Sequence, residues 1–354
     1  DRPLDADRIE APARVDSYWG DGYGVMRAEQ RFIAGDPAPT SDFREVSSPL
    51  TGEMLRPSLT GRGVVQFRKR LIDGDFRQLG EWFRLYPEMT LRAYGSYDHS
   101  IVDLEFLRFF PTLRRFGADA LWDSLTSLDG LRHLPADLEQ LGIGATQAKL
   151  DLAILARFRE LTWLFLEGQT KHLEVISGLG SLDDLTLRSI TMPDLSLLLT
   201  LKRLRSLDLK LGGTRDLRLL PRVGELRYLE LWMIRGLTDV SAVGQIPSLR
   251  ALFLQALRQV EALPEFHQAT ELRRVRLETM KGLRDLSPLA TAPALEGIEL
   301  IDMRHLQPED LAPLIGLPRL KAVTPGLGSH RKNEAAAGLL RLPSVSEPYD
   351  WTTA

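Results

Sequence analysis

The side chains that most often perform chemistry in proteins are few in this chain and far apart. Cysteine is absent, and the six histidines are His99, His133, His172, His267, His305 and His330. No two of them have the spacing of metal ligands. The chain also lacks a phosphate-binding Gly-x-x-x-x-Gly-Lys loop, a His-Glu-x-x-His zinc motif and a Gly-x-Ser-x-Gly nucleophile elbow. We interpret the pair Asp98-His99 as a solvated turn. The sequence therefore predicts no catalytic residue, no metal site and no cofactor.

A second set of residues has the chemistry of non-covalent recognition. Trp, Tyr and Arg carry much of the binding energy at protein interfaces. Nine aromatic and basic side chains recur at alternate positions of short apolar segments: Trp163, Phe165, Arg188, Lys210, Tyr228, Trp232, Phe253, Arg274 and Arg276. Whether they form one surface depends on the elements that position them.

Those elements follow from a repeat. The phrase Leu-x-x-Leu-x-Leu recurs at intervals of 21 to 25 residues. Its first positions are Leu113, Leu138, Leu161, Leu182, Leu204, Leu226, Leu249, Leu272, Leu295 and Leu320. This period resembles that of the bacterial leucine-rich repeat proteins, and the repeat length is similar to that of the internalins. The resemblance implies an α/β fold: a solenoid with a curved parallel sheet on its concave face and short α or 3-10 turns on its convex face.

Within each repeat, the strand alternates between the core and the concave face. Positions four and six point inward, and positions three, five and seven point to the concave face. The nine candidate residues occupy these outer positions. Because neighbouring repeats lie about 5 Å apart, Trp163 with Phe165 should lie roughly 15 Å from Tyr228, Trp232 and Phe253. We expect these rings to face solvent and to mark a partner-binding surface.

Two further features of the repeat concern its turns. Most first-position leucines have an aspartate ten residues before them, which can accept backbone N–H bonds and start a convex turn. These aspartates are Asp103, Asp151, Asp194, Asp216, Asp239, Asp285 and Asp310. Position nine, where many such repeats carry asparagine, is mostly apolar here. We expect this turn to be packed by hydrophobic contact.

The ends of the chain lack the repeat. We assign residues 1–85 to an N-terminal capping region, 86–327 to the solenoid and 328–354 to a C-terminal cap or tail, because an open solenoid must cover its apolar ends. In the first region we expect a hairpin of 43–48 with 54–58 and a helical face over 63–83. In the last we expect a helix over 333–342 with Asn333 as its cap, and Trp351 packed back onto it.

Composition limits the classes of partner that we expect this chain to bind. The net charge is −3, from 45 basic and 48 acidic residues, so we expect no nucleic-acid partner. No apolar run has membrane-span length. Scarce lysine and asparagine beside abundant arginine are typical of a GC-rich bacterial genome. We expect a cytoplasmic protein, with a removed leader as the alternative because residue 1 is Asp rather than Met.

Several functions are consistent with these features. The leading hypothesis is a non-enzymatic module that binds a protein or peptide on its concave face. A narrower version is an inhibitor or immunity protein that blocks a bacterial toxin or enzyme. The alternative from another class is a small N-terminal enzymatic domain, with groups such as Asp16, Asp21, Asp36 and Arg44, for which the repeats select the substrate. The concave face could also form a homodimer or be covered by the ends of the chain.

Overall fold

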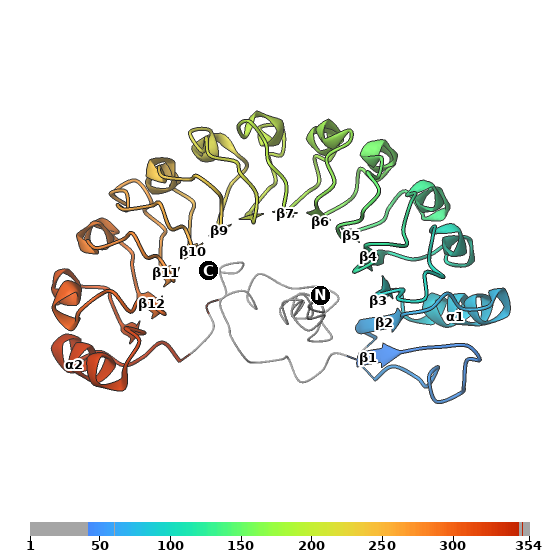
Figure 1. Cartoon of the computed structure of the whole chain (residues 1–354), viewed down its shortest axis with the longest axis horizontal. Coiled ribbons are helices and arrows are strands. Elements are labelled where there is room, and N and C mark those ends of the chain that lie inside the picture. The colour runs from blue at the N-terminus through green and yellow to red at the C-terminus, as the bar shows by residue number, and fades with distance from the viewer. Residues whose placement is uncertain (1–41, 60, 347–348, 350–354) are drawn as a thin grey trace, which may run out of the picture.

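A single parallel sheet in chain order organises the molecule. The computed structural model describes residues 42–59, 61–346 and 349. Its thirteen strands curve into an arc and line the inner side of that arc (Figure 1). The strands are β1 Asp42–Glu45, β2 Gly63–Phe67, β3 Met89–Tyr94, β4 Arg115–Asp119, β5 Gln140–Ile143, β6 Trp163–Glu167, β7 Asp184–Arg188, β8 Ser206–Lys210, β9 Tyr228–Trp232, β10 Ala251–Gln255, β11 Arg274–Glu278, β12 Gly297–Ile301 and β13 Ala322–Pro325. The predicted leucine-rich repeat solenoid is confirmed.

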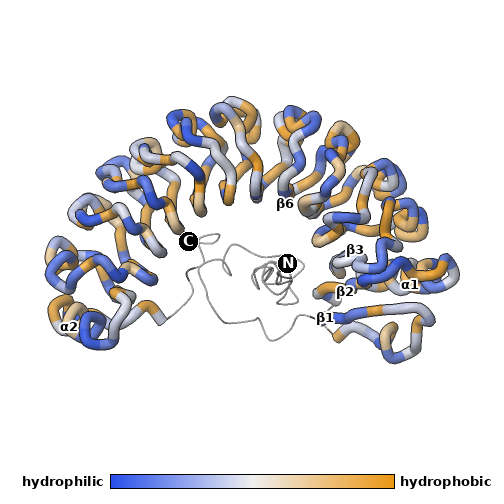
Figure 2. The backbone as a smooth tube through the Cα atoms, viewed as in Figure 1, coloured by the Kyte–Doolittle hydropathy of each residue, from blue (hydrophilic) through white to orange (hydrophobic). Residues whose placement is uncertain are grey.

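The leucines of the repeat form the core. In the repeat that contains β6, Leu161, Leu164 and Leu166 are fully buried. The same positions stack from strand to strand, as in the pairing of Leu185 with Leu207 and of Leu207 with Leu229. Each fully buried leucine contributes about 1.5–3 kcal/mol of hydrophobic free energy relative to an exposed one. Figure 2 shows that apolar residues recur in every coil of the arc.

Short 3-10 helices form the convex side of the arc. They are η3 Glu105–Phe109, η4 Asp129–His133, η5 Leu152–Arg157, η6 Leu173–Gly178, η7 Ser196–Leu198, η8 Leu220–Arg222, η9 Ser241–Gln245, η10 Ser287–Thr291 and η11 Pro308–Leu314. The predicted aspartate caps are confirmed at six repeats, where the carboxylate accepts the N–H two residues later: Asp103, Asp151, Asp194, Asp216, Asp239 and Asp285. Asp310 differs, because its carboxylate accepts the N–H of Gln307 in a reciprocal capping box.

The turn after each strand is stabilised without an asparagine at position nine. In eight repeats the residue at position eight has a positive φ, and seven of the eight are not glycine: Ala120, Gly168, Ser189, Leu211, Met233, Ala256, Thr279 and Asp302. This conformation lets the N–H continue the ladder into the next repeat, as from Met233 to the carbonyl of Gln255 at 2.9 Å. The position-nine side chains Leu257, Met280 and Met303 are buried, which confirms the expected hydrophobic turn.

The N-terminal elements differ from their prediction. β1 pairs in parallel with β2, from Asp42 opposite Gly63 to Glu45 opposite Gln66, so the predicted hairpin is wrong. The helical face predicted over 63–83 is also wrong in its first part, because Gly63–Phe67 is a strand that contains the β-branched pair Val64 and Val65. The helix α1 covers only Asp73–Leu85. Residue 85 is therefore not an end of the sheet, which continues through β2 to β1.

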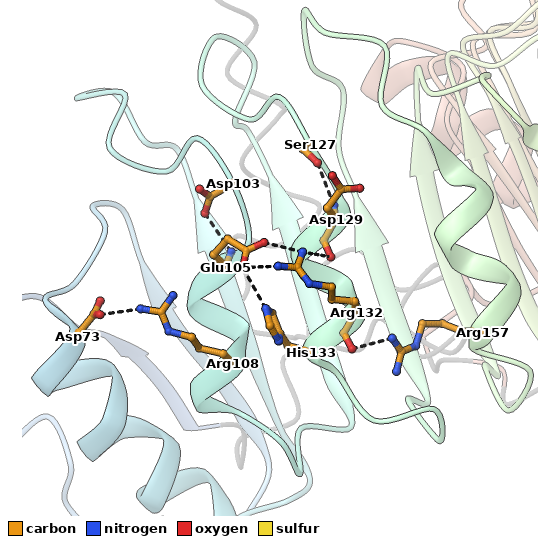
Figure 3. Close-up of polar contacts among 9 residues, drawn as sticks. All are labelled: Asp73, Asp103, Glu105, Arg108, Ser127, Asp129, Arg132, His133 and Arg157. Carbon is orange, nitrogen blue, oxygen red and sulfur yellow. Dashed lines mark hydrogen bonds and ion pairs between the residues drawn. The ribbon is translucent and has the colours of Figure 1, made fainter.

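A phenylalanine cluster fills the core near its N-terminal end. Phe76 of α1 stacks on Phe106 of η3 at 5.0 Å between ring centroids, and Phe67 meets both rings edge-on. Polar contacts on the convex side follow the same elements (Figure 3). Arg108 reaches Asp73 of α1 at 2.6 Å, and Glu105 pairs with Arg132 at 2.7 Å. Such solvent-exposed pairs contribute little each, so the aromatic packing supplies most of the stabilisation.

The C-terminal end is closed by the helix α2, His330–Leu340. The predicted helix is confirmed with shifted bounds, and its cap is Ser329 rather than Asn333. The side-chain oxygen Oδ1 of Asn333 instead accepts the N–H of Leu327 at 2.7 Å. Ala336 and Leu340 are buried against the last repeat. The predicted contact of Trp351 lies outside the described residues.

The aspartate caps can be tested with Asp239→Ala. The Ser241 N–H and hydroxyl hold the pKa of Asp239 below its usual range. The cap should therefore stabilise the fold at neutral pH and lose its effect as the pH falls below about 4 and the carboxylate takes up a proton. We expect a loss of about 1 kcal/mol in the free energy of unfolding at pH 7. Urea unfolding measures it, with the exposed Asp137→Ala as control. An equal loss in both variants would contradict this role.

Position eight can be tested at Thr279, a β-branched residue with φ 54°. A left-handed conformation is strained for such a side chain, whereas glycine adopts it freely. Thr279→Gly should raise the free energy of unfolding by about 0.5–1 kcal/mol, after the larger chain entropy of unfolded glycine is included. Thr279→Ala is the matched control, because alanine keeps the Cβ. Thermal unfolding that ranks Ala at or above Gly would refute the strain.

Candidate functional site

The nine predicted binding residues lie on six consecutive strands of the concave face. Trp163 and Phe165 are on β6, Arg188 on β7 and Lys210 on β8. Tyr228 and Trp232 are on β9, Phe253 on β10, and Arg274 with Arg276 on β11. The parallel register places equivalent positions side by side, so this concave band, β6 to β11, is continuous.

The aromatic residues of the concave band are buried rather than exposed. Trp163 is 8 % exposed, Phe165 3 %, Phe253 6 % and Tyr228 0 %. The expectation that these rings face solvent is therefore wrong for four of the five; Trp232 is partly exposed. Trp163 stacks on Phe165 with 6.4 Å between centroids. Tyr228, Ala251 and Phe253 form a cluster against which Tyr349 packs. The tyrosine comes from the C-terminal segment and could not be placed by the repeat.

A charge network occupies the middle of the concave band. The Lys210 ammonium lies 3.1 Å from Asp208 and 2.8 Å from Glu230. Tyr228 donates its hydroxyl proton to Glu230 at 3.0 Å, and Thr186 donates to Asp208 at 3.2 Å. All of these side chains are buried. Sequence reasoning selected Lys210 and Tyr228 as site residues but did not pair them with Asp208 and Glu230. A comparison of positions five and seven between adjacent repeats would have identified these two carboxylates.

Two further cations of the concave band lie near aromatic rings. The Arg188 guanidinium lies 5.5 Å from the Trp232 ring and pairs with Glu167 at 2.9 Å. Burial raises the pKa of Glu167, and Arg188 opposes that shift. Arg276 lies 4.8 Å from the Phe253 ring. The band therefore combines both signs of charge with aromatic rings, a combination suited to a folded protein or a peptide.

A second buried ion pair extends the polar surface toward the N-terminal end. Arg92 of β3 donates to both carboxylate oxygens of Asp119 on β4, at 2.8 and 2.6 Å. The same guanidinium donates to Gln66 at 3.0 Å and lies 4.1 Å from the Tyr94 ring. The repeat predictions did not include this pair, because β3 departs from the Leu-x-x-Leu-x-Leu phrase.

Arg274 lies beside Tyr349 at the C-terminal end of the concave band. Its guanidinium carbon lies 5.7 Å from the centroid of the Tyr349 ring. Gly297 on the next strand makes room for it, because a Cβ there would lie 2.0 Å from Arg274 Nη1. Arg274 Nε and Nη1 and the Tyr349 hydroxyl are buried and have no hydrogen-bond partner among the described residues. Burial also raises the pKa of Glu299, against the nearby Arg276 and Arg274.

The described residues contain no cluster of three or more His, Asp or Glu side chains that could hold a metal ion. Among them, no helix has both the length and the apolar character needed to cross a bilayer. The predictions that the protein is not an enzyme and takes no cofactor stay predictions.

Comparisons with known proteins find similar chains among solved structures alone. No protein-family model matches the chain, and no curated protein matches it. An internalin from Listeria monocytogenes is 20 % identical, with 62 % of this chain and 64 % of that chain covered and a TM-score of 0.45. The functional domain of InlJ from the same organism is 14 % identical, with 66 % and 57 % covered and a TM-score of 0.41.

A third solved structure is TLR13 in a complex with ssRNA13. It is 15 % identical, with 79 % of this chain and 50 % of that chain covered and a TM-score of 0.48. This chain matches less than two thirds of the length of each of these three proteins. The likeness concerns the fold alone.

The buried network can be tested with Lys210→Met. Removal of the ammonium leaves Asp208 and Glu230 as buried carboxylates that repel each other, so the free energy of unfolding should fall by about 3 kcal/mol or more. Chemical unfolding at pH 7 measures the loss. The matched control is Lys202→Met at an exposed position, which should change stability by less than about 0.5 kcal/mol. Similar stabilities for the two variants would show that the network is not structural.

Proposed function

We propose that this protein is a non-enzymatic binding module that holds a protein or peptide partner on its concave band. The observation that carries the proposal is the composition of that surface. Six adjacent strands bring together aromatic rings, cations and carboxylates on a preorganised sheet, and preorganisation lowers the entropic cost of binding. Arg, Trp and Tyr are the residue types expected at the centre of a protein interface.

The charges of the concave band favour a partner of mixed charge. Asp208 and Glu230 lie among Arg188, Lys210 and Arg276, and Glu299 lies on the adjacent strand β12. A surface that follows a phosphate backbone needs an excess of cations, which these carboxylates remove. A protein or peptide therefore fits better than nucleic acid, and the absence of a nucleic-acid partner stays a prediction.

The test must avoid residues whose loss would unfold the sheet. Tyr228 is fully buried, so its replacement by alanine would combine loss of binding with loss of stability. Trp232 and Arg276 are partly exposed and lie on β9 and β11. The variant that carries Trp232→Ala and Arg276→Ala is the sharper probe.

We expect this double variant to bind its partner at least about tenfold more weakly, because two interface anchors typically contribute 1–2 kcal/mol or more each. The partner is first identified by affinity capture from the host and mass spectrometry, and its affinity is then measured by calorimetry with purified components. The control is Trp122→Ala, a tryptophan outside the strands that is 53 % exposed. Undiminished affinity in the double variant, with circular dichroism unchanged, would reject the concave band as the binding site.

A further inference from the structure

The chain does not leave the solenoid after its last helix. The carbonyl of Pro343 accepts the N–H of Val323 on β13 at 2.9 Å, and the N–H of Val345 donates to Thr324 Oγ1 at 3.0 Å. The segment after α2 therefore runs beside the edge strand of the sheet. Farther along the same segment, Tyr349 packs on the cluster of Tyr228, Ala251 and Phe253. The C-terminal segment thus reaches the concave band itself.

The surroundings of Tyr349, which we call the Tyr349 site, contain three arginines. Arg274 lies beside the ring, and Arg250 and Arg273 are close enough to influence the hydroxyl. Burial raises the pKa of Tyr349, whereas these arginines oppose the shift. Arg250 and Arg273 also pair with Glu271 and Glu296, at 2.9 and 2.5 Å. The residues from 346 to the end of the sequence include Glu347 and Asp350 and no basic residue, so the segment is acidic, whereas the three arginines of the site outnumber their two glutamate partners.

The fit of Tyr349 is nevertheless incomplete. Its hydroxyl and two nitrogens of Arg274 are buried without a hydrogen-bond partner among the described residues. A buried polar group without a partner loses the hydrogen bonds that water would supply. A ligand that placed a carboxylate next to Arg274 would satisfy these donors and would bind more strongly than the tyrosine alone.

We propose that the C-terminal segment is an internal occupant of the Tyr349 site, and that the partner displaces it with an aromatic side chain that carries or adjoins a carboxylate. This inference rests on the proposed function of the concave band. It adds the chemistry of the partner and a competition between that partner and the segment.

The competition has a magnitude that an experiment can detect. A segment tethered next to its site acts at an effective concentration on the order of 1 mM. A free peptide of the same sequence therefore binds poorly to the intact chain, unless the internal copy is removed. Tyr349→Ala removes the internal aromatic side chain and leaves Pro343 and Val345 on β13.

The first experiment titrates a synthetic peptide with the sequence of residues 344–354 into the full chain. We expect Tyr349→Ala to bind this peptide at least about tenfold more tightly than the wild-type chain does. Two changes should abolish the gain: alanine at the tyrosine of the peptide, and Arg274→Ala in the Tyr349→Ala chain. The control chain is Tyr97→Ala, whose tyrosine is 75 % exposed and outside the concave band. Equal binding by the wild-type and Tyr349→Ala chains would overturn the inference.

A second measurement uses the unaltered segment. The chain is labelled with 3-fluorotyrosine, and Tyr349→Phe identifies the Tyr349 signal among those of the seven tyrosines. We expect this signal to differ from that of the free peptide and to approach it when purified partner is added. A Tyr349 signal that already coincides with that of the free peptide would overturn the proposed occupancy.

The two proposals fail in different ways. If Tyr349 is docked in both measurements but the partner binds normally to the variant with Trp232→Ala and Arg276→Ala, the proposed function fails and the internal occupant stands. If the partner loses affinity for that double variant but binds equally to the wild-type and Tyr349→Ala chains, the concave band stands and the competition is refuted. A gain of about tenfold in partner affinity for Tyr349→Ala supports both.

Discussion

The register between neighbouring parallel strands is the constraint on which this structure depends. A shift by one residue would place every inward leucine on the concave face and every concave side chain in the core. The stacked leucines prevent such a shift, because Leu185, Leu207 and Leu229 lie opposite one another on consecutive strands and are fully buried. The thirteen strands thus remain in chain order along the sheet.

This register also determines which polar residues can meet. Residues about 22 positions apart in sequence become neighbours about 5 Å apart. Lys210 therefore lies between Asp208 on its own strand and Glu230 on the next. Burial weakens the competition from water, so a charge on this face is stable only with its partners in place. The pairing of buried charges across adjacent strands belongs to the proposed recognition surface. It also makes several charged residues of the concave band necessary for stability.

The periodic part of the structure could be predicted from sequence, and the rest depended on contacts without a period. The leucine core and six aspartate caps follow from residues that recur. Gly63–Phe67 does not carry the leucine phrase, and its pattern predicts a helix where the structure has a strand. The burial of Tyr228 and Phe253 depends partly on Tyr349, about a hundred residues away in sequence. No local pattern encodes such a contact, which explains why these rings were expected to face solvent.

The C-terminal segment combines two tasks that can be separated physically. An open solenoid must protect its last strand, because the unpaired edge of a sheet can pair with other chains. Pro343 and Val345 meet that need on β13 through a backbone bond and a bond to Thr324. Tyr349 lies beyond these anchors along the chain and makes its contacts on β9, β10 and β11. Release of the tyrosine therefore need not expose the edge of the sheet, and a partner could enter the concave band while the end of the solenoid stays closed.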